Sequence, residues 1–462
     1  MGGGKLNKAF TLIELLAIIV ILAIIAIITI PIILNVIDNS SKGAAIDSAY
    51  GYKNAVNDFY VQELYEDPNF KLDGGYNVKD GRLNGLDILV SGTKPTNGTL
   101  IYENNVLKDG CLAIDGYKIT IEDGEVTDTT KGTCEDESLT SCTSPYFHPS
   151  PVEWFKFDTS DPTMLIGFQE KDDEHPNGWD GATEITIPCK NPGGQDITSI
   201  SNEAFTNANI ITSVVIPDTV TLISNAAFRG NPIKNLILGQ NVEEISLTAF
   251  DMIGMQKGAC SFKTLVLPDS VKRTAEAAFR GCDIEDLIFD GDVEEISTSA
   301  FSGGSIENII FNGNVNTITN GSFYSGSIEN IVFNGNVNTI SNSSFADNSI
   351  ENIVFNGNIK TITNSAFQGH KLRSIILPEG LETVGYSAFA SEYLEEITFP
   401  KNTSDIVYFS STHLHPNLKT IYNNTGKAYD WNEILGNASS EPFITGTVTR
   451  EDASTVNILE SN

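Results

Sequence analysis

The feature that most constrains the fold is a phenylalanine that returns about every 22 residues through the second half of the chain. These anchor residues are Phe205, Phe228, Phe250, Phe279, Phe301, Phe323, Phe345, Phe367 and Phe389. One interval, from Phe250 to Phe279, is longer, and its extra segment DMIGMQKGACS is expected to form a surface loop. A fixed period of this length indicates a solenoid built from one repeated structural unit.

Each unit carries apolar residues at six recurring positions. In the unit SIENIVFNGNVNTISNSSF they are Ile328, Ile331, Phe333, Val337, Ile340 and Phe345. A single unit is too small to bury this apolar face alone, so neighbouring units have to stack. About nine stacked turns at strand spacing would form a rod roughly 45 Å long. We therefore predict that these six positions form a continuous core.

Over about residues 184–400, the pattern resembles the leucine-rich repeats of the BspA type, which bacterial surface proteins carry. The resemblance implies an adhesive or host-interacting role, although such repeats bind many unrelated partners. We predict an N-terminal cap over residues 152–196 and repeats over residues 197–400. A C-terminal cap over residues 401–448 and a disordered tail over residues 449–462 are expected to follow.

The N-terminal part of the chain contains a long apolar run over residues 10–37. As a helix it would measure about 42 Å, which exceeds the thickness of a bilayer core. Lys5 and Lys8 are the only charges before it, and positive charge favours the cytoplasmic side. We predict a transmembrane and assembly helix over residues 10–37, with the remainder of the protein outside the cytoplasm.

The stretch KAFTLIELL, which begins at Lys8, resembles the prepilin N-terminus of type IV pilins and pseudopilins. The resemblance implies that residues 1–9 are a leader peptide and that a prepilin peptidase cleaves between Ala9 and Phe10. It also implies methylation of the new amine of Phe10. The family usually has Gly before the cut, where this chain has Ala9.

Glu14 and Pro31 interrupt the apolar run. A carboxylate near the bilayer interior costs about 2.5–3.5 kcal/mol on insertion scales. The protonated amine of Phe10 on a neighbouring subunit could pair with Glu14, which would make the charge pair an assembly signal; alternatively, Glu14 reaches the membrane interface. Pro31 matches the family's kinking proline and removes a backbone donor, so it should bend the helix, with or without a special role.

Residues 38–128 are predicted to form a pilin-like α+β region. Ile46, Tyr50 and Val56 keep a helical period, and short β-rich runs follow. We predict hairpin turns at Asp109-Gly110, Asp115-Gly116 and Asp123-Gly124. Residues 129–151 lack an apolar period and read as a linker. The predicted fold class is α+β and β-solenoid: a long N-terminal pilin helix with a small antiparallel sheet, followed by a leucine-rich-repeat solenoid.

The chain has six cysteines and no CxxC pair, which argues against zinc ribbons and thioredoxin-like sites. An even number of cysteines favours disulfides. Six cysteines permit about 15 connectivities, which sequence cannot separate. The chain neighbours are candidate pairs: Cys111 with Cys134, Cys142 with Cys189, and Cys260 with Cys282.

The composition excludes some functions. A net charge of -32, from 60 acidic and 28 basic residues, disfavours direct binding of nucleic acid. The motifs GxSxG, GxxxxGK[ST] and HExxH do not occur in the sequence. The acidic stretch KDDEHPNGWDG lacks the ligand spacing of a calcium loop. We expect no enzymatic activity, no cofactor and no metal site.

Strand alternation predicts a candidate binding face on the repeats. It places Ile331 and Phe333 inside, and Asn330 and Val332 outside. The candidate residues on this face are Ile288, Asn308, Ile310, Asn330, Val332, Asn352, Val354 and Ile376. Alternatively, the apolar column reflects only the preference of β-branched residues for strands. A second column is predicted to be a turn-stabilising ladder, namely Asn312, Asn334 and Asn356.

These features lead to one leading functional hypothesis, a pilus-associated adhesin. A head of about 300 residues would crowd a filament, so a minor or tip subunit fits better than a major one. Its expected partners are other pilin subunits, the prepilin peptidase, the membrane through the N-terminal helix, and an unknown surface protein or glycan. We expect it to be membrane-anchored before assembly and then at the cell surface or in the pilus. The alternatives are a pseudopilin of a secretion or DNA-uptake machine, and a membrane-tethered surface protein that never assembles.

Overall fold

The described residues form two compact units that divide near residue 137. The structure is a computed structural model. Its description leaves out residues 1–37, 65–70, 73, 85, 91, 135–138, 145–146, 207, 253, 255–257, 402, 404, 407–415, 436–444, 450–454 and 461–462. Among the residues that it does describe, no helix is both long and apolar enough to cross a membrane.

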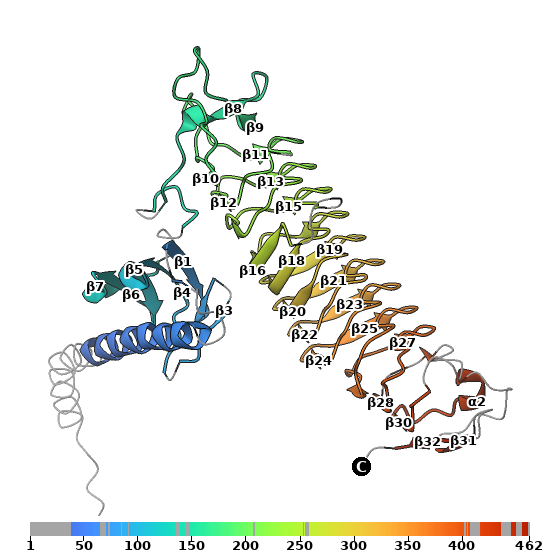
Figure 1. Ribbon diagram of the computed structural model, residues 1–462. Coiled ribbons are helices and arrows are strands. Elements are labelled where there is room, and N and C mark those ends of the chain that lie inside the picture. Colours follow the sequence, from blue (N-terminus) through green and yellow to red (C-terminus); the bar gives the residue numbers. More distant parts are fainter. Residues whose placement is uncertain are drawn as a thin grey trace, which may run out of the picture. The chain divides into compact units, whose positions relative to one another are not determined.

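The first unit packs a helix against an antiparallel sheet (Figure 1). The helix is described over residues 38–64. The strands are β1 (Gly74–Lys79), β2 (Arg82–Leu83), β3 (Leu86–Asp87), β4 (Asn97–Glu103), β5 (Val106–Ile114), β6 (Tyr117–Glu122) and β7 (Glu125–Lys131), in the spatial order β3-β2-β1-β4-β5-β6-β7. Ala45, Ala49, Tyr52 and Val56 bury one side of the helix among sheet residues. Val56 was predicted to lie on the apolar side, whereas Ala45, Ala49 and Tyr52 bury the helix in place of Ile46 and Tyr50, because small alanines allow close contact with the sheet.

Two of the three predicted Asp-Gly turns are hairpin turns. Asp115-Gly116 and Asp123-Gly124 join β5 to β6 and β6 to β7, and all four residues have positive φ, as tight hairpin turns require. The turn predicted at Asp109-Gly110 is wrong, since both residues lie within β5. A Cβ on Gly110 would come within 2.6 Å of the Thr99 carbonyl oxygen, so glycine here permits close strand approach.

The second unit is a parallel β-solenoid in which each turn contributes one strand to each of two faces (Figure 1). One face is a continuous twelve-stranded sheet, which we call the long sheet. Its strands are β8 (Phe155–Phe157), β9 (Met164–Phe168), β11 (Ser199–Ile200), β13 (Leu222–Ile223), β15 (Glu244–Ile245), β17 (Arg273–Thr274), β19 (Val293–Ile296), β21 (Val315–Ile318), β23 (Val337–Ile340), β25 (Ile359–Ile362), β27 (Thr383–Val384) and β29 (Asp405–Ile406). All of its pairings are parallel except that of β8 with β9.

The opposite face is divided into three successive sheets, and we call it the split face. The first sheet contains β10 (Glu184–Thr186), β12 (Ser213–Val215) and β14 (Asn235–Ile237). The second contains β16 (Ser261–Leu267), β18 (Asp283–Phe289), β20 (Ile306–Phe311), β22 (Asn330–Phe333) and β24 (Asn352–Phe355). The third contains β26 (Ser374–Ile376), β28 (Glu396–Phe399), β30 (Thr420–Asn423), β32 (Thr455–Leu459) and β31 (Gly446–Thr449). Two short helices flank the solenoid, η2 (Val152–Trp154) and α2 (Trp431–Ile434).

The anchor phenylalanines form a stack through the solenoid core. Their successive ring centroids lie 4.9–5.3 Å apart, from Phe205 to Phe389, with the rings nearly parallel. This spacing is close to the separation of neighbouring strands, so each ring covers the next as the turns stack. In the unit that ends at Phe345 all six recurring apolar positions are buried, which confirms the core predicted from the repeat. Stability therefore depends on contacts between adjacent turns.

The corner before each anchor phenylalanine has a left-handed residue. Ser343 has φ +54° two positions before Phe345, and the equivalent residues in the other repeats also have positive φ. The Phe345 backbone N–H donates to the Ala366 carbonyl of the next turn, at 2.8 Å. The corner therefore links adjacent turns directly, and small residues tolerate its backbone conformation better than β-branched ones.

The predicted fold class requires correction. The described part of the chain is mostly a β-solenoid of the leucine-rich-repeat kind, to which each repeat adds two strands. It is not a long pilin helix with a sheet, because the N-terminal helix is described over residues 38–64 alone. The region predicted to extend it, residues 10–37, lies outside the described residues. The disordered tail predicted over residues 449–462 is also wrong in part, since β32 pairs with both β30 and β31.

Candidate functional site

The predicted binding face lies on the split face, and its apolar column becomes more exposed toward the C-terminal end. Ile288 is only 1% exposed, so it adds no accessible surface to this face, although it lies outside the core cluster that contains Leu287 and Phe289. Ile310 and Val332 are half-buried. Val354 and Ile376 are 44% and 75% exposed. The accessible apolar surface is therefore concentrated on β24 and β26.

The amide column on this face is a hydrogen-bonded ladder. Asn308 Nδ2 donates to Asp286 Oδ1 at 2.8 Å, Asn330 Nδ2 donates to Asn308 Oδ1 at 2.8 Å, and Asn352 Nδ2 donates to Asn330 Oδ1 at 2.7 Å. Every amide thus points its donor toward a carboxylate at the head of the ladder, an alignment that strengthens each bond. Because each amide is hydrogen-bonded to the equivalent side chain of the neighbouring turn, the ladder stabilises the stack of repeats.

A second ladder confirms the predicted stacking of turn asparagines. Asn312 Nδ2 donates to Asp290 Oδ1 at 3.0 Å, and the bonds from Asn334 to Asn312 and from Asn356 to Asn334 measure 3.1 and 2.8 Å. The ladder again begins at an aspartate and continues through asparagines at 22-residue intervals. Its geometry supports the structural interpretation of these residues, namely that they hold successive turns in register.

A polar trough lies next to the long sheet. Its volume is about 870 Å³, and Asn314, Asn336 and Asn358 line it. Asn314 Oδ1 accepts the backbone N–H of Asn336 at 2.9 Å, and Asn336 Oδ1 accepts that of Asn358 at 2.9 Å. The carbonyl ends of these amides are thus engaged with the backbone. The trough is shallow, and the side-chain oxygens of Asn314 and Asn336 are already bonded to the backbone of the next turn.

The split face is interrupted between β24 and β26, whereas β25 and β27 directly behind remain paired. A cavity of about 1000 Å³ lies at this break, lined by both strands. Ile353 and Phe355 on β24 are half-buried, while the equivalent Ile331 and Phe333 on β22 are buried. The break therefore leaves a partly apolar groove, which we call the strand groove, defined by β24, β26 and the cavity between them.

The sequence differs at two positions near the break. In the preceding turns, the residue after each strand donates its N–H to the turn before, as Asn356 does to the Phe333 carbonyl at 2.8 Å. The equivalent residue after β26 is Pro378, which has no N–H to donate to Phe355. Proline alone is not sufficient, because Pro400 follows β28 and that strand still pairs with β26.

The second position is His370, which stands where the preceding turn has Asn348. The two turns before that have Gly304 and Gly326 there and their strands still pair, so His370 does not by itself explain the break. Asn348 reaches back, and its Nδ2 donates to the carbonyl of Phe323 in the preceding turn at 2.7 Å. His370 bonds forward instead, with Nε2 3.1 Å from the Phe389 carbonyl oxygen, while Nδ1 accepts the Leu372 N–H at 3.0 Å. Burial lowers the pKa of His370 to about 4, so the ring is neutral at pH 7. The backward side-chain bond of Asn348 has no counterpart at His370, but the Lys371 backbone N–H still donates to the Ile350 carbonyl of the preceding turn, at 2.9 Å.

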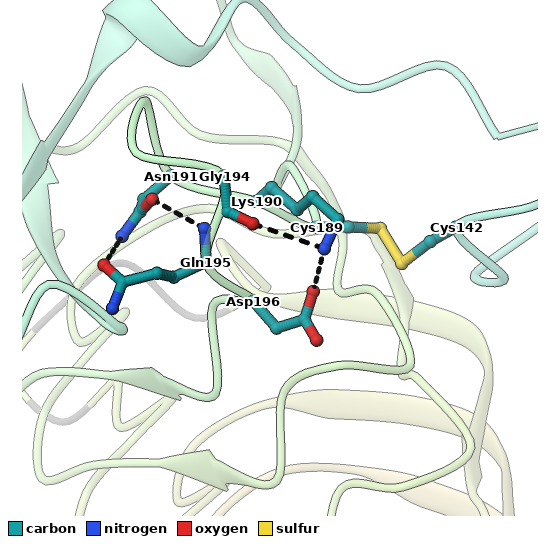
Figure 2. Close-up of polar contacts among 7 residues, drawn as sticks. All are labelled: Cys142, Cys189, Lys190, Asn191, Gly194, Gln195 and Asp196. Atoms are coloured by element: carbon teal, nitrogen blue, oxygen red, sulfur yellow. Dashed lines mark hydrogen bonds and ion pairs between the residues drawn. A yellow bond between two sulfur atoms is a disulfide. The ribbon is translucent and has the colours of Figure 1, made fainter.

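The start of the solenoid is fixed by a disulfide and a compact loop (Figure 2). Cys142 is bonded to Cys189, and the loop after Cys189 is closed by an ion pair between Lys190 and Asp196, with N and O 2.6 Å apart. Asn191 Oδ1 accepts the Gln195 backbone N–H at 3.0 Å within the same loop. These contacts cover the end of the first repeat, which is the function of a cap.

The other cysteines are paired as well. Cys111 is bonded to Cys134 in the first unit, and Cys260 to Cys282 in the solenoid. The second of these bonds joins β16 to the turn before β18, so it ties two neighbouring repeats together. Disulfides persist in oxidising compartments, such as the outside of a cell.

The remaining predicted site residues cannot be placed in the structure. Ala9, Phe10, Glu14 and Pro31 lie outside the described residues. No group of three or more His, Cys, Asp or Glu side chains suited to a metal ion occurs in the described part of the chain. Sequence reasoning placed Val354 and Ile376 on a uniform stripe and missed the strand groove. The sequence signal that could have revealed the groove is the change from Phe-Asn-Gly at the end of β24 to Leu-Pro-Glu after β26.

Several solved structures have a distant similarity to this chain. A leucine-rich repeat protein from Bacteroides ovatus is 18% identical, with a TM-score of 0.40, over 59% of this chain and 73% of that one. A leucine-rich repeat protein from T. pallidum is 16% identical, with a TM-score of 0.32, over 43% of this chain and 89% of that one. A leucine-rich cell surface protein from Faecalibacterium prausnitzii is 18% identical, with a TM-score of 0.23, over 62% of this chain and 96% of that one. No curated protein matches the sequence.

The family model for the BspA type leucine rich repeat region matches the chain in six copies. The matched segments are residues 182–257, 256–373 and 339–424, which together span more than half of the 462 residues. The same residues form the stacked turns of the solenoid. The chain therefore belongs to the BspA-type leucine-rich-repeat family.

Proposed function

We propose that the chain is an extracytoplasmic surface protein whose leucine-rich-repeat head binds a protein or glycan partner. The observation that carries this proposal is the exposed apolar surface on β24 and β26, where Val354 and Ile376 lie on neighbouring turns and are 44% and 75% exposed. Exposed apolar patches on soluble domains commonly mark interaction sites. The three disulfides support a location in an oxidising compartment.

We further propose that the head is carried by a prepilin-type N-terminal segment, as a minor or tip subunit of a pilus. The support comes from the sequence KAFTLIELL and from Glu14 within the apolar run. Cleavage before Phe10 would create an amine that pairs with Glu14 of a neighbouring subunit. In this proposal the partners are pilin subunits, the prepilin peptidase, the membrane and a surface ligand. The protein performs no catalysis and does not bind nucleic acid directly.

The test uses cells that express the full chain, either native or carrying Glu14→Ala. Sheared surface filaments are labelled with immunogold against the repeats, and the mature N-terminus is identified by mass spectrometry. We expect a methylated Phe10 at the N-terminus, and filament labelling that falls at least tenfold in Glu14→Ala. Thr11→Ala is the matched control, because it removes a neighbouring polar group without removing a charge. Equal labelling of native protein and Glu14→Ala would refute the assembly argument.

The same experiment separates the alternatives. Protein that retains Met1 or Gly2 would not be a pilin, and surface labelling of intact cells would then identify a membrane-tethered protein that does not assemble. A processed N-terminus with labelling confined to the cell envelope would instead favour a pseudopilin. Binding by the head is independent of either result, because the solenoid is a separate compact unit.

A further inference from the structure

The outer side of the split face carries parallel columns of side chains, with one residue per turn in each. Along each strand, the amide ladder lies between an apolar column and an acidic column. The apolar column contains Ile310, Val332, Val354 and Ile376, and the acidic column contains Glu285, Glu307, Glu329 and Glu351. The strands β18, β20, β22 and β24 pair in register, so neighbouring members of a column lie about 4.8 Å apart along the stack.

The apolar column ends in an accessible patch. Val354, Ile376 and Tyr393 of the following turn are exposed. All three line the cavity of about 1000 Å³ beside β24 and β26. Exposed apolar side chains that gather around a hollow are suited to contact with another molecule.

The acidic column has no basic residues in its own turns. Residues 281–359 contain eleven Asp and Glu residues and no Lys, Arg or His. Glu307 and Glu329 are exposed, and the side chain of neither one is bonded to another described residue. The Glu329 backbone N–H donates to the Glu307 carbonyl at 3.0 Å, which places the two glutamates on adjacent turns. Like charges this close repel each other, and a cation bound between them would relieve the repulsion.

The basic residues around the cavity do not reverse this charge. Arg373 stands where the acidic column would continue, and it pairs with Glu395 at 3.0 Å, while Lys371 pairs with Glu351 at 3.6 Å. Glu379, just after β26, has no side-chain partner among the described residues. The uncompensated charge beside the apolar column is therefore negative. It disfavours an anionic lipid, a nucleic acid and a second copy of a chain of net charge -32.

We propose that this face binds a cationic amphipathic helix of a partner protein, which lies along the stack of turns. The apolar column from Ile310 to Ile376 is about 14 Å long at strand spacing, which is about three turns of a helix. The acidic column lies about 10 Å away along the strands, and a helix with its side chains is about 10–12 Å wide. Basic residues on one flank of the helix therefore reach Glu307 and Glu329 while its apolar side covers the apolar column.

An amphipathic helix that lays its apolar side on an apolar surface is a common mode of peptide recognition. The charge on its flank adds selectivity, because an acidic helix of the same shape is repelled. The inference rests on the proposed role of the head in binding, and it names the surface and the chemistry of the partner.

The probe is the synthetic peptide KLLKKLLKKLLKKL, whose leucines and lysines occupy opposite sides of a helix. The full chain is held in phosphatidylcholine nanodiscs, and binding of the labelled peptide is measured by fluorescence anisotropy with empty nanodiscs as the blank. We expect saturable binding that weakens at least tenfold between about 0.1 M and about 1 M salt, since the Debye length falls from about 10 Å to about 3 Å. A peptide with glutamate in place of every lysine should not bind. Carbodiimide coupling and mass spectrometry should join peptide lysines to Glu307 and Glu329.

Matched substitutions separate this face from the general acidity of the chain. Glu307→Gln combined with Glu329→Gln removes two charges at constant size, so it should weaken binding at least tenfold and leave the melting temperature unchanged or higher. Glu203→Gln combined with Glu243→Gln removes the same charge at exposed positions next to β11 and β15, and it should bind within twofold of the native protein. Ile376→Ser, which removes exposed apolar surface, should weaken binding at least fivefold with native stability.

Three results would overturn the proposal. The first is equal affinity of the native protein and the variant with glutamine at positions 307 and 329. The second is an equal loss in the control with glutamine at positions 203 and 243, which would mean that the peptide responds only to overall charge. The third is self-association that blocks the peptide, which would assign the face to a second copy of the chain. None of these results affects the filament-labelling test, so the failure of this surface and the failure of the proposed function are distinguishable.

Discussion

Truncating one ring of the phenylalanine stack should destabilise the solenoid strongly. Phe323 is fully buried, and its ring centroid lies 5.3 Å from that of Phe301 and 4.9 Å from that of Phe345. Phe323→Ala removes the buried ring and leaves a cavity, which costs about 3–5 kcal/mol. Each of the two lost stacking contacts is worth about 0.5–1.5 kcal/mol, so we expect a value near the top of that range.

The assay is guanidinium unfolding of the full chain, followed by far-UV circular dichroism and tryptophan fluorescence. Repeats are coupled only to their neighbours. Removing the Phe323 ring should therefore let the repeats before it and the repeats after it unfold separately, which lowers the apparent cooperativity of unfolding. Phe323→Leu is the control, because it keeps an apolar side chain and should cost less than about 1.5 kcal/mol. A loss below about 1 kcal/mol for Phe323→Ala would refute the argument that stacked rings couple the repeats.

Three further perturbations test other parts of the solenoid. Arg280→Met should cost about 2 kcal/mol in chemical unfolding, because the buried Asp251 carboxylate loses both hydrogen bonds from the guanidinium, at 3.0 and 2.9 Å, while Arg229 Nε at 3.4 Å still compensates its charge; a loss below about 0.5 kcal/mol would contradict this. Replacing both Cys260 and Cys282 by serine should lower the free energy of unfolding by about 3 kcal/mol, given their sequence separation of 22, and an unchanged value would argue against the bond. The pKa of His370 is lowered to about 4 in the folded protein, below its ordinary value of 6.5, so stability is complete above pH 6.5 and falls as the pH decreases toward 4, by about 3 kcal/mol. His370→Asn should flatten this pH dependence, and an unchanged slope would exclude His370 as its source.

The sequence was most informative where one physical constraint repeats. The recurrence of Phe301, Phe323 and Phe345 at a constant interval predicts stacked units, because no other arrangement buries such short segments. The ladder of Asn312, Asn334 and Asn356 was predictable for the same reason. Regular spacing along the chain becomes regular spacing in space, so these parts required no knowledge of distant contacts.

Prediction was weaker where a single residue changes the pattern. Val332, Val354 and Ile376 occupy equivalent positions in the repeat, yet Val332 is half-buried and Ile376 is 75% exposed. The difference accompanies the loss of pairing between β24 and β26, which does not follow from the repeat itself. Alternation along a strand says which way a side chain points, but not whether the neighbouring strand is present to cover it.

The amino-acid sequence by itself determined that the chain contains a solenoid of stacked repeats, since its apolar positions recur at one interval and can be buried only by neighbouring turns. Only the tertiary structure decided where that stack is interrupted. Whether β24 and β26 pair depends on hydrogen bonds between residues about 22 positions apart. Such bonds depend on three-dimensional geometry, and their absence here goes with the exposed apolar surface of Val354 and Ile376.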